Sequence, residues 1–97
     1  MPILLGKLLI FMPINFSSMK PKEISPEHQE LFFEIGKRIR ELRKSKGISY
    51  IELANQIGIS RNSYNQVELG ISNFQFSTLL VILKYHKIGV KAFLKDI

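Results

Sequence analysis

The stretch "ELANQIGISRNSYNQVELG" (residues 52–70) decides the fold of this chain. It holds two short segments with helical apolar spacing, one on either side of Gly58. Segments this short are not stable as isolated helices, so both must pack against something larger. Their candidate buried residues are Leu53, Ala54, Ile57, Ile59, Tyr64 and Val67. The stretch therefore predicts a helix-turn-helix, which is two helices joined by a tight turn.

Start and stop signals flank both segments. Ser49 and Ser60 are suited to cap helix N-termini, and Glu52 completes a capping box with Ser49. Gly58 and Gly70 are suited to end the two helices, since glycine adopts the left-handed conformation that closes a helix. The predicted helices cover residues 50–57 and 61–69.

A longer helix precedes this pair. In "ISPEHQE" (residues 24–30), Ser25 is the expected N-cap and Pro26 the first helical residue. Gly47 is expected to stop the helix, which gives a predicted span of residues 26–45. Its apolar stripe, at spacings of three and four, is Phe32, Ile35, Ile39 and Leu42.

A fourth helix is predicted over residues 76–86, after the loop "ISNFQF" (residues 71–76). Its stripe comprises Leu79, Ile82, Leu83 and His86, with His86 expected to be half-buried in the core. A last short turn of helix is expected within residues 89–97. Because no segment alternates convincingly with a period of two, the sequence predicts an all-α fold.

At these residues the chain resembles the phage-repressor-like helix-turn-helix family, of the lambda repressor and Cro type. The resemblance rests on "IGKRIRELRKSKGIS" (35–49), residues 52–70 and "STLLVILKYHKIGVKAFL" (77–94), in the family's order and spacing. It implies a compact bundle of about five helices that binds operator DNA, usually as a dimer. We therefore expect a DNA-binding domain over residues 35–97, with residues 19–34 as an extension leading into the first helix.

The resemblance assigns base reading to three residues of the recognition helix, Arg61, Asn62 and Gln66. Their chemistry agrees, because Arg can bind guanine O6 and N7 while Asn or Gln can bind adenine N6 and N7. Secondary or phosphate contacts are expected at Tyr50, Ser60, Ser63 and Asn65. The alternative is an ordinary solvated helix face, although such a face would favour Glu, Lys and Ala over Asn and Ser.

A further pair has a structural assignment. Family members commonly pair an Arg late in the first helix with a Glu late in the third, and Arg43 and Glu68 stand at these positions. The resemblance implies a largely buried bridge that holds the recognition helix in place. The alternative is two unconnected surface charges.

The charge distribution sets a limit on DNA binding. The net charge is +6, from 14 basic and 8 acidic residues, which suits an anionic partner; the alternative is a basic, soluble surface with no such partner. Six of the basic residues lie in residues 37–46 and four in residues 84–95, whereas residues 47–83 contain only Arg61. The predicted recognition region is thus nearly neutral and offers few phosphate contacts.

The sequence lacks the residues that other classes of function require. The chain has no cysteine and two isolated histidines, so neither a disulfide framework nor a metal site is expected. No constellation of acid, base and nucleophile is visible, so we expect no enzyme activity and no cofactor.

The segment "MPILLGKLLIFMPINF" (residues 1–16) is apolar but too short to cross a membrane as a helix. We expect residues 1–18 to be a start-site artefact before Met19 or a disordered tail; the alternatives are an interfacial anchor and packing onto the domain. No membrane association is expected, and the predicted location is the cytoplasm.

These observations predict a sequence-specific transcriptional regulator that binds a near-palindromic operator in double-stranded DNA as a homodimer. The helix at residues 61–69 would lie in the major groove. The expected dimer surface is the segment 83–97, through Tyr85, Ile88, Val90, Phe93 and Leu94. The alternative function is a protein-interaction module, such as the antitoxin of a toxin–antitoxin pair.

Overall fold

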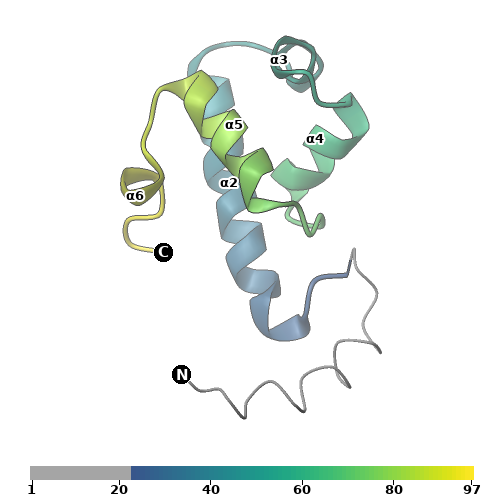
Figure 1. The fold of residues 1–97 in the computed structure, drawn as a ribbon, viewed down its shortest axis with the longest axis vertical. Coiled ribbons are helices and arrows are strands. Elements are labelled where there is room, and N and C mark those ends of the chain that lie inside the picture. Colours follow the sequence, from purple (N-terminus) through teal and green to yellow (C-terminus); the bar gives the residue numbers. More distant parts are fainter. Residues whose placement is uncertain (1–22) are drawn as a thin grey trace.

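A computed structural model describes residues 23–97 of the chain, in which helices are joined by turns and loops and no strand occurs (Figure 1). The prediction of an all-α fold is therefore confirmed. The predictions for residues 1–18 fall on residues that lie outside the described part. In chain order the elements are η1 (Pro26–His28), α2 (Gln29–Ser45), α3 (Tyr50–Ile57), α4 (Arg61–Leu69), α5 (Phe76–His86) and α6 (Val90–Phe93).

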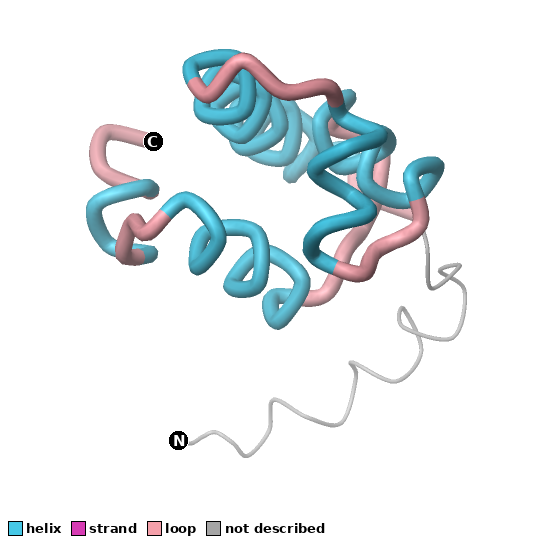
Figure 2. The backbone as a smooth tube through the Cα atoms, turned by 90° about the horizontal axis from the view of Figure 1, so that it is seen from above, coloured by secondary structure: helices cyan, strands magenta, loops and turns pink. Residues whose placement is uncertain are grey.

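The long helix α2 is the centre of the fold, and the shorter helices pack around it (Figures 1 and 2). Its buried residues are Ile35, Gly36 and Ile39, on the face predicted from the apolar stripe. The core is completed by Leu53 and Ala54 of α3, Tyr64 and Val67 of α4, Leu79, Ile82 and Leu83 of α5, and Phe93 of α6. One apolar cluster thus fixes all five α-helices relative to one another.

The N-terminal end of the first helix differs from the prediction. Residues 26–28 form a 3₁₀ turn in which the His28 N–H donates to the Ser25 carbonyl at 2.8 Å, and α2 begins at Gln29. The side chain of Ser25 makes no capping hydrogen bond. Ser25 thus occupies the predicted N-cap position, with Pro26 as the first residue of the turn, but only its main-chain carbonyl takes part in the cap.

The crossing of α2 and α4 requires a glycine. A Cβ atom at Gly36 would lie 2.4 Å from the carbonyl oxygen of Val67 and 2.6 Å from that of Glu68. Both are backbone atoms of α4, which cannot rotate away as a flexible side chain can. Gly36 therefore lets the two helices approach to a distance that no other residue would allow.

The C-terminal segment packs largely against the core, and its expected role as a dimer surface stays a prediction. Phe93 is only 3% exposed, and Tyr85, Ile88, Val90 and Leu94 are half-buried against the core. A small core absorbs these side chains because α6 folds back toward α2 and α5 (Figure 2). In addition, Arg38 Nη1 of α2 donates to the carbonyls of Phe93 at 2.8 Å and Lys95 at 2.7 Å.

Candidate nucleic-acid interface

The helix pair α3–α4 is built by the caps that the sequence predicts. Ser49 Oγ accepts a hydrogen bond from the Glu52 N–H, and Ser60 Oγ accepts one from the Ser63 N–H, each at 3.1 Å. Gly58 ends α3 in the left-handed conformation, with a φ of +76°. These local interactions set the angle at which α4 leaves the turn.

The two sides of α4 differ in both burial and chemistry. Tyr64, Val67 and Glu68 face inward and are buried. Arg61 and Asn62, in the first turn of α4, are exposed. Arg61 precedes Tyr64 and Glu68 by three and seven residues, so it borders the inward side, and Asn62 lies farther from that side. The core therefore holds one face of α4, and polar side chains of the helix stay exposed and able to contact another molecule.

The remaining predicted contact residues surround this surface. Ser63 is exposed, and Asn65 and Gln66 are half-buried. Ser60 is exposed, but its oxygen already caps α4. Tyr50, at the start of α3, is half-buried and packs against the core. The structure therefore brings the base-reading candidates together on α4, while the contacts of all seven residues with DNA stay predictions.

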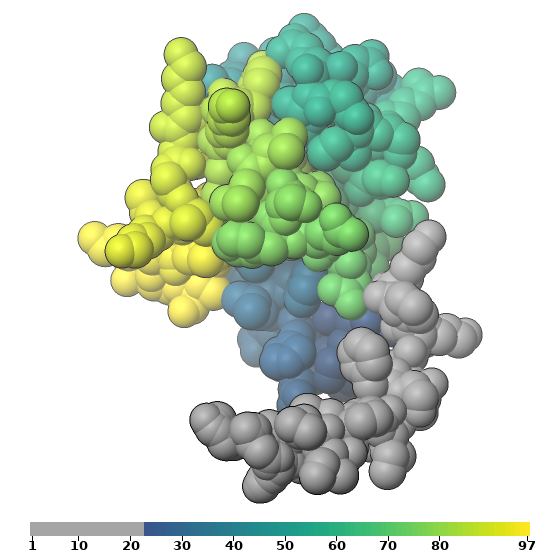
Figure 3. Space-filling view, viewed as in Figure 1, coloured from purple at the N-terminus to yellow at the C-terminus, as the bar shows by residue number. Residues whose placement is uncertain are grey.

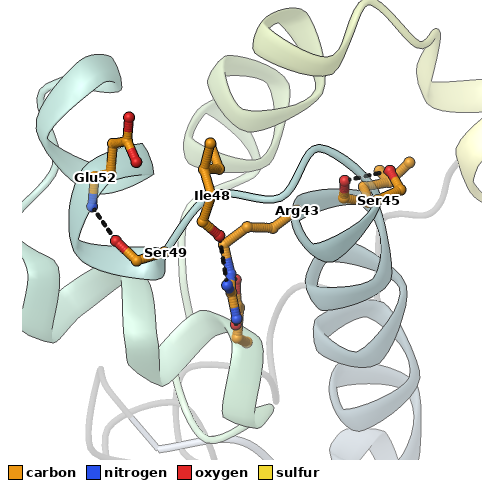
Figure 4. Close-up of polar contacts among 7 residues, drawn as sticks. Arg43, Ser45, Ile48, Ser49 and Glu52 are labelled. Carbon is orange, nitrogen blue, oxygen red and sulfur yellow. Dashed lines mark hydrogen bonds and ion pairs between the residues drawn. The ribbon is translucent and has the colours of Figure 1, made fainter.

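Arg43 and Glu68 form a bidentate ion pair between α2 and α4. Arg43 Nε lies 2.6 Å from Glu68 Oε2, and Nη2 lies 3.0 Å from Oε1. Arg43 Nη1 also donates to the Ile48 carbonyl at 2.8 Å, in the connection between α2 and α3 (Figure 4). One guanidinium therefore joins three parts of the fold, and the planar fork of Arg suits this geometry.

The pair is well shielded from water. The side chain of Glu68 is only 3% exposed and that of Arg43 is 12% exposed. The hydrogen bond to Glu68 raises the pKa of Arg43, which favours its charged form. Burial and, to a smaller extent, the nearby Glu68 carboxylate raise the pKa of Tyr64, so its phenol stays neutral. A buried charge pair and a neutral phenol thus line the inner side of α4.

Sequence reasoning missed three contacts that position this region. Gly36 allows α4 to reach α2, and Arg38 holds the C-terminal turn. Asn73, in the loop after α4, donates to the Glu23 carbonyl at 3.0 Å. A glycine beside the buried Ile35 in the middle of a helix was an available signal of close packing, because glycine destabilises a helix interior. Nothing in the sequence indicated the acceptors of Arg38 or Asn73, which are main-chain carbonyls distant along the chain.

Residues 23–97 contain neither a metal-binding cluster nor a membrane-spanning helix. This part of the chain has no cluster of three or more His, Cys, Asp or Glu side chains able to hold a metal ion. None of its helices has the length and apolar character needed to cross a membrane.

The geometry of α3 and α4 agrees with comparisons to known proteins. A family model described as helix-turn-helix matches residues 39–92. The chain belongs to this family. The match includes α3, α4 and Arg43, so it confirms the lambda-repressor-like resemblance of the sequence.

One similar protein is an HTH-type transcriptional regulatory protein of Pyrococcus abyssi, 36% identical over 83 residues. The match covers 84% of this chain but spans only 25% of that relative. A similar solved structure is the restriction-modification controller protein C.AhdI from Aeromonas hydrophila, with a TM-score of 0.64 and 30% identity over 69% of this chain and 97% of that one. Together these matches support a DNA-binding regulator.

Proposed function

We propose that this chain binds a specific double-stranded DNA site through α4, placed in the major groove, and so regulates transcription. The observation that carries the proposal is that α4 has an inner side held by the core and by an ion pair, and exposed polar side chains in its first turn. Arg61 and Asn62 are exposed, while Glu68 is tied to Arg43. A helix that reads bases must present such side chains at a fixed orientation, because base contacts depend on direction and distance.

The same arrangement implies two copies of the chain on each site. One recognition helix covers only a few base pairs, and Arg61 is the only cation in residues 47–83. A single domain would therefore bind too weakly to find its site among competing sequences. Two copies related by a twofold axis double the contacts, and their half-sites would lie about one helical turn, roughly 34–36 Å, apart on a near-palindromic operator.

The second candidate is a protein-interaction module. Exposed apolar side chains favour it, since Ile71 is 61% exposed and Phe76 is 58% exposed. The two candidates differ in their response to salt. Affinity for DNA falls steeply as salt rises because phosphate binding releases counterions, whereas an apolar interface with a protein does not weaken in this way.

Selection from a random DNA pool tests the proposal directly. Repeated selection with the full chain should enrich near-palindromic sequences, and fluorescence anisotropy should show salt-dependent binding to them. The double variant Arg61→Ala/Asn62→Ala should enrich no such sequence while retaining the helical content of the wild type. Failure of the wild-type chain to enrich any sequence would contradict the proposal.

Lys91→Ala is the matched control for loss of positive charge. Lys91 is exposed on α6, and both ribbon views place α6 on the opposite side of the molecule from α4. Its removal should leave the selected sequence unchanged. If Lys91→Ala abolished selection as the α4 variant does, net charge rather than the α4 surface would explain the binding.

A further inference from the structure

We infer that the apolar N-terminal segment, residues 1–16, docks into an apolar groove on its own domain, formed by α2, the start of α5 and the C-terminal residues. None of the residues that line this groove belongs to α3 or α4, so the docking does not depend on the proposed function. The segment itself lies outside the described residues, whereas every residue of the groove is described.

The groove is lined by apolar side chains alone. Its volume is about 490 Å³, within the range of about 300–1,000 Å³ that is usual for clefts that hold a ligand. Leu31 of α2, Phe76 of α5 and Ile97 lie around it, exposed to 40%, 58% and 44%. In Figure 3 these three parts of the chain, coloured blue, green and yellow, meet on one face of the molecule. Such a surface suits an apolar partner and offers no side chain that would bind a DNA phosphate.

The described part of the chain begins beside this groove. The Glu23 carbonyl accepts a hydrogen bond from Asn73 Nδ2 at 3.0 Å. The residue after Asn73, Phe74, lines the groove. Its ring meets that of Phe32, another lining residue, edge to face, with the ring centroids 5.2 Å apart. Asn73 therefore holds Glu23 next to one wall of the groove.

The connection to the N-terminal segment is short. Residues 17–22 alone separate the segment from Glu23. A stretch of this length spans about 20 Å when it is fully extended, so the segment can reach the groove without any change in the described fold. A short tether also gives an effective concentration in about the millimolar range, so a weak apolar contact is enough to keep the segment docked. The tether thus favours this segment over a separate protein as the occupant.

The composition of the N-terminal segment matches the groove. The stretch "MPILLGKLLIFMPINF" (residues 1–16) is mainly aliphatic, with two phenylalanines and a single charged side chain, that of Lys7. Removing apolar side chains from water is favourable roughly in proportion to the area that is covered. Docking covers the segment and the groove at the same time, so it removes two apolar surfaces from water.

A depression next to the groove suits the one charged side chain of the segment. The depression shares Leu31 and Ile97 with the groove. It is lined by four carboxylates and no cation; the carboxylates are those of Glu27, Glu30, Glu34 and Asp96. Arg38 Nε lies 3.5 Å from the Glu34 carboxylate and offsets one of these charges, so the depression stays negative. A lysine among aliphatic residues can place its ammonium group there while its neighbours lie in the groove.

Tryptophan fluorescence tests the docking, because the chain contains no tryptophan. In the full-length Phe11→Trp variant, the indole should emit at a shorter wavelength in buffer than in urea, and should be shielded from acrylamide. The contact is intramolecular, so neither property should change over about a 100-fold range of protein concentration. Emission in buffer equal to that in urea would overturn the inference. Loss of shielding on dilution would also overturn it, since the groove would then be filled by a second copy.

Substitution of the groove residues tests the site of docking. In the Phe11→Trp chain, Leu31→Ser/Phe76→Ser should shift the emission to the wavelength seen in urea. The matched control is Ile51→Ser/Leu69→Ser, because these apolar residues are exposed to 36% and 44% and neither lines the groove. Circular dichroism should confirm that both variants are folded. Equal emission wavelengths for the two variants would overturn the inference.

Single substitutions give the same comparison with a smaller change to the fold. In the Phe11→Trp chain, Ile97→Ser removes an exposed side chain from the C-terminal wall of the groove and should increase quenching by acrylamide. Lys7→Glu should increase quenching as well, whereas Lys7→Arg, which keeps the charge, should not. Quenching unchanged by Ile97→Ser would overturn docking in this groove. Equal quenching in Lys7→Glu and Lys7→Arg would overturn the placement of Lys7 at the acidic depression.

Discussion

The helices α4 and α5 both pack one side on the same core, but they differ in how that side is held and in what the other side offers. The inner side of α4 includes a charged residue, Glu68, fixed by Arg43, whereas the buried residues of α5, Leu79, Ile82 and Leu83, are all apolar. Three of the four exposed residues of α4 are polar, the exception being Leu69, whereas the exposed residues of α5 include the apolar Phe76, Leu80 and Val81. In α4 directional bonds accompany exposed polar side chains, whereas in α5 apolar packing accompanies exposed apolar side chains. If α4 reads bases as proposed, the directional bonds would supply the fixed orientation that base contacts require.

Removing the ion pair between Arg43 and Glu68 should have the largest effect on the free energy of unfolding. Glu68→Ala leaves the buried guanidinium of Arg43 without its partner, and the loss in free energy of unfolding should be about 3–5 kcal/mol. Urea denaturation followed by circular dichroism measures it. Glu52→Ala, which removes an exposed carboxylate, is the control and should change stability little. The double variant Arg43→Met/Glu68→Leu should recover much of the loss, because it leaves no unpaired buried charge. A Glu68→Ala variant as stable as Glu52→Ala would contradict this role.

Forcing α2 and α4 apart where they cross should have the next largest effect on the free energy of unfolding. In Gly36→Ala the new methyl group meets the backbone of Val67 and Glu68, so the helices must separate, at a cost of about 1–3 kcal/mol. Thermal unfolding compares this variant with Gly89→Ala, where no atom lies within 4 Å of the added carbon and the φ is −75°. Equal midpoints for the two variants would show that the close approach is not required.

Changing the outer side of α4 should affect specificity and leave stability unchanged. Arg61→Ala removes an exposed guanidinium, and the expected loss is about 1–3 kcal/mol of discrimination at one base position. Anisotropy titrations against every single-base variant of the selected site would measure this loss. Equal discrimination by wild type and variant at all positions would refute base reading by Arg61.

The smallest expected effect on stability comes from His86, a half-buried polar residue of α5. Burial, together with the nearby Lys46 charge, lowers the pKa of His86 below the ordinary value for histidine, about 6.5. The unfolded chain therefore binds a proton at His86 more readily than the folded chain does. The stability that this group contributes is complete above pH 6.5 and falls as the pH drops below that value.

Urea denaturation at pH 7 and at about pH 5 would measure this linkage. His86→Leu should reduce the loss of stability between the two pH values. His28→Gln, which changes an exposed histidine, is the control and should behave as the wild type does. A His86→Leu variant with the full wild-type loss would assign the pH dependence to other groups.

The sequence predicted the helices well where local signals are strong. Ser49, Ser60, Gly58 and Gly70 mark caps whose chemistry is local, and α3 and α4 have the predicted bounds. Ser25 stands at the predicted N-cap position, but its side chain makes no capping hydrogen bond and the first turn is a 3₁₀ turn.

The exposed surfaces were harder to predict, because burial depends on residues far apart in the chain. Phe93 is an aromatic residue of the kind often found at interfaces, yet it is buried because α6 folds back onto α2 and α5. Leu80 lies in an apolar run and belongs to the outward side only because Leu79 and Leu83 take the core positions. Arg61 and Asn62 were assigned by the resemblance, and the structure adds their exposure.

The hydrogen bonds from Arg38 to the carbonyls of Phe93 and Lys95 affect the order in which parts of the domain unfold. The helix α6 has one buried residue, Phe93, and its end is held by the guanidinium of Arg38. The helix α4 has three buried residues and the ion pair to α2. In native-state hydrogen exchange, the amides of α6 should therefore exchange through local unfolding, while those of α2 and α4 exchange together in a larger cooperative unit. The surface of α4 would then stay folded after the C-terminal end has begun to unfold.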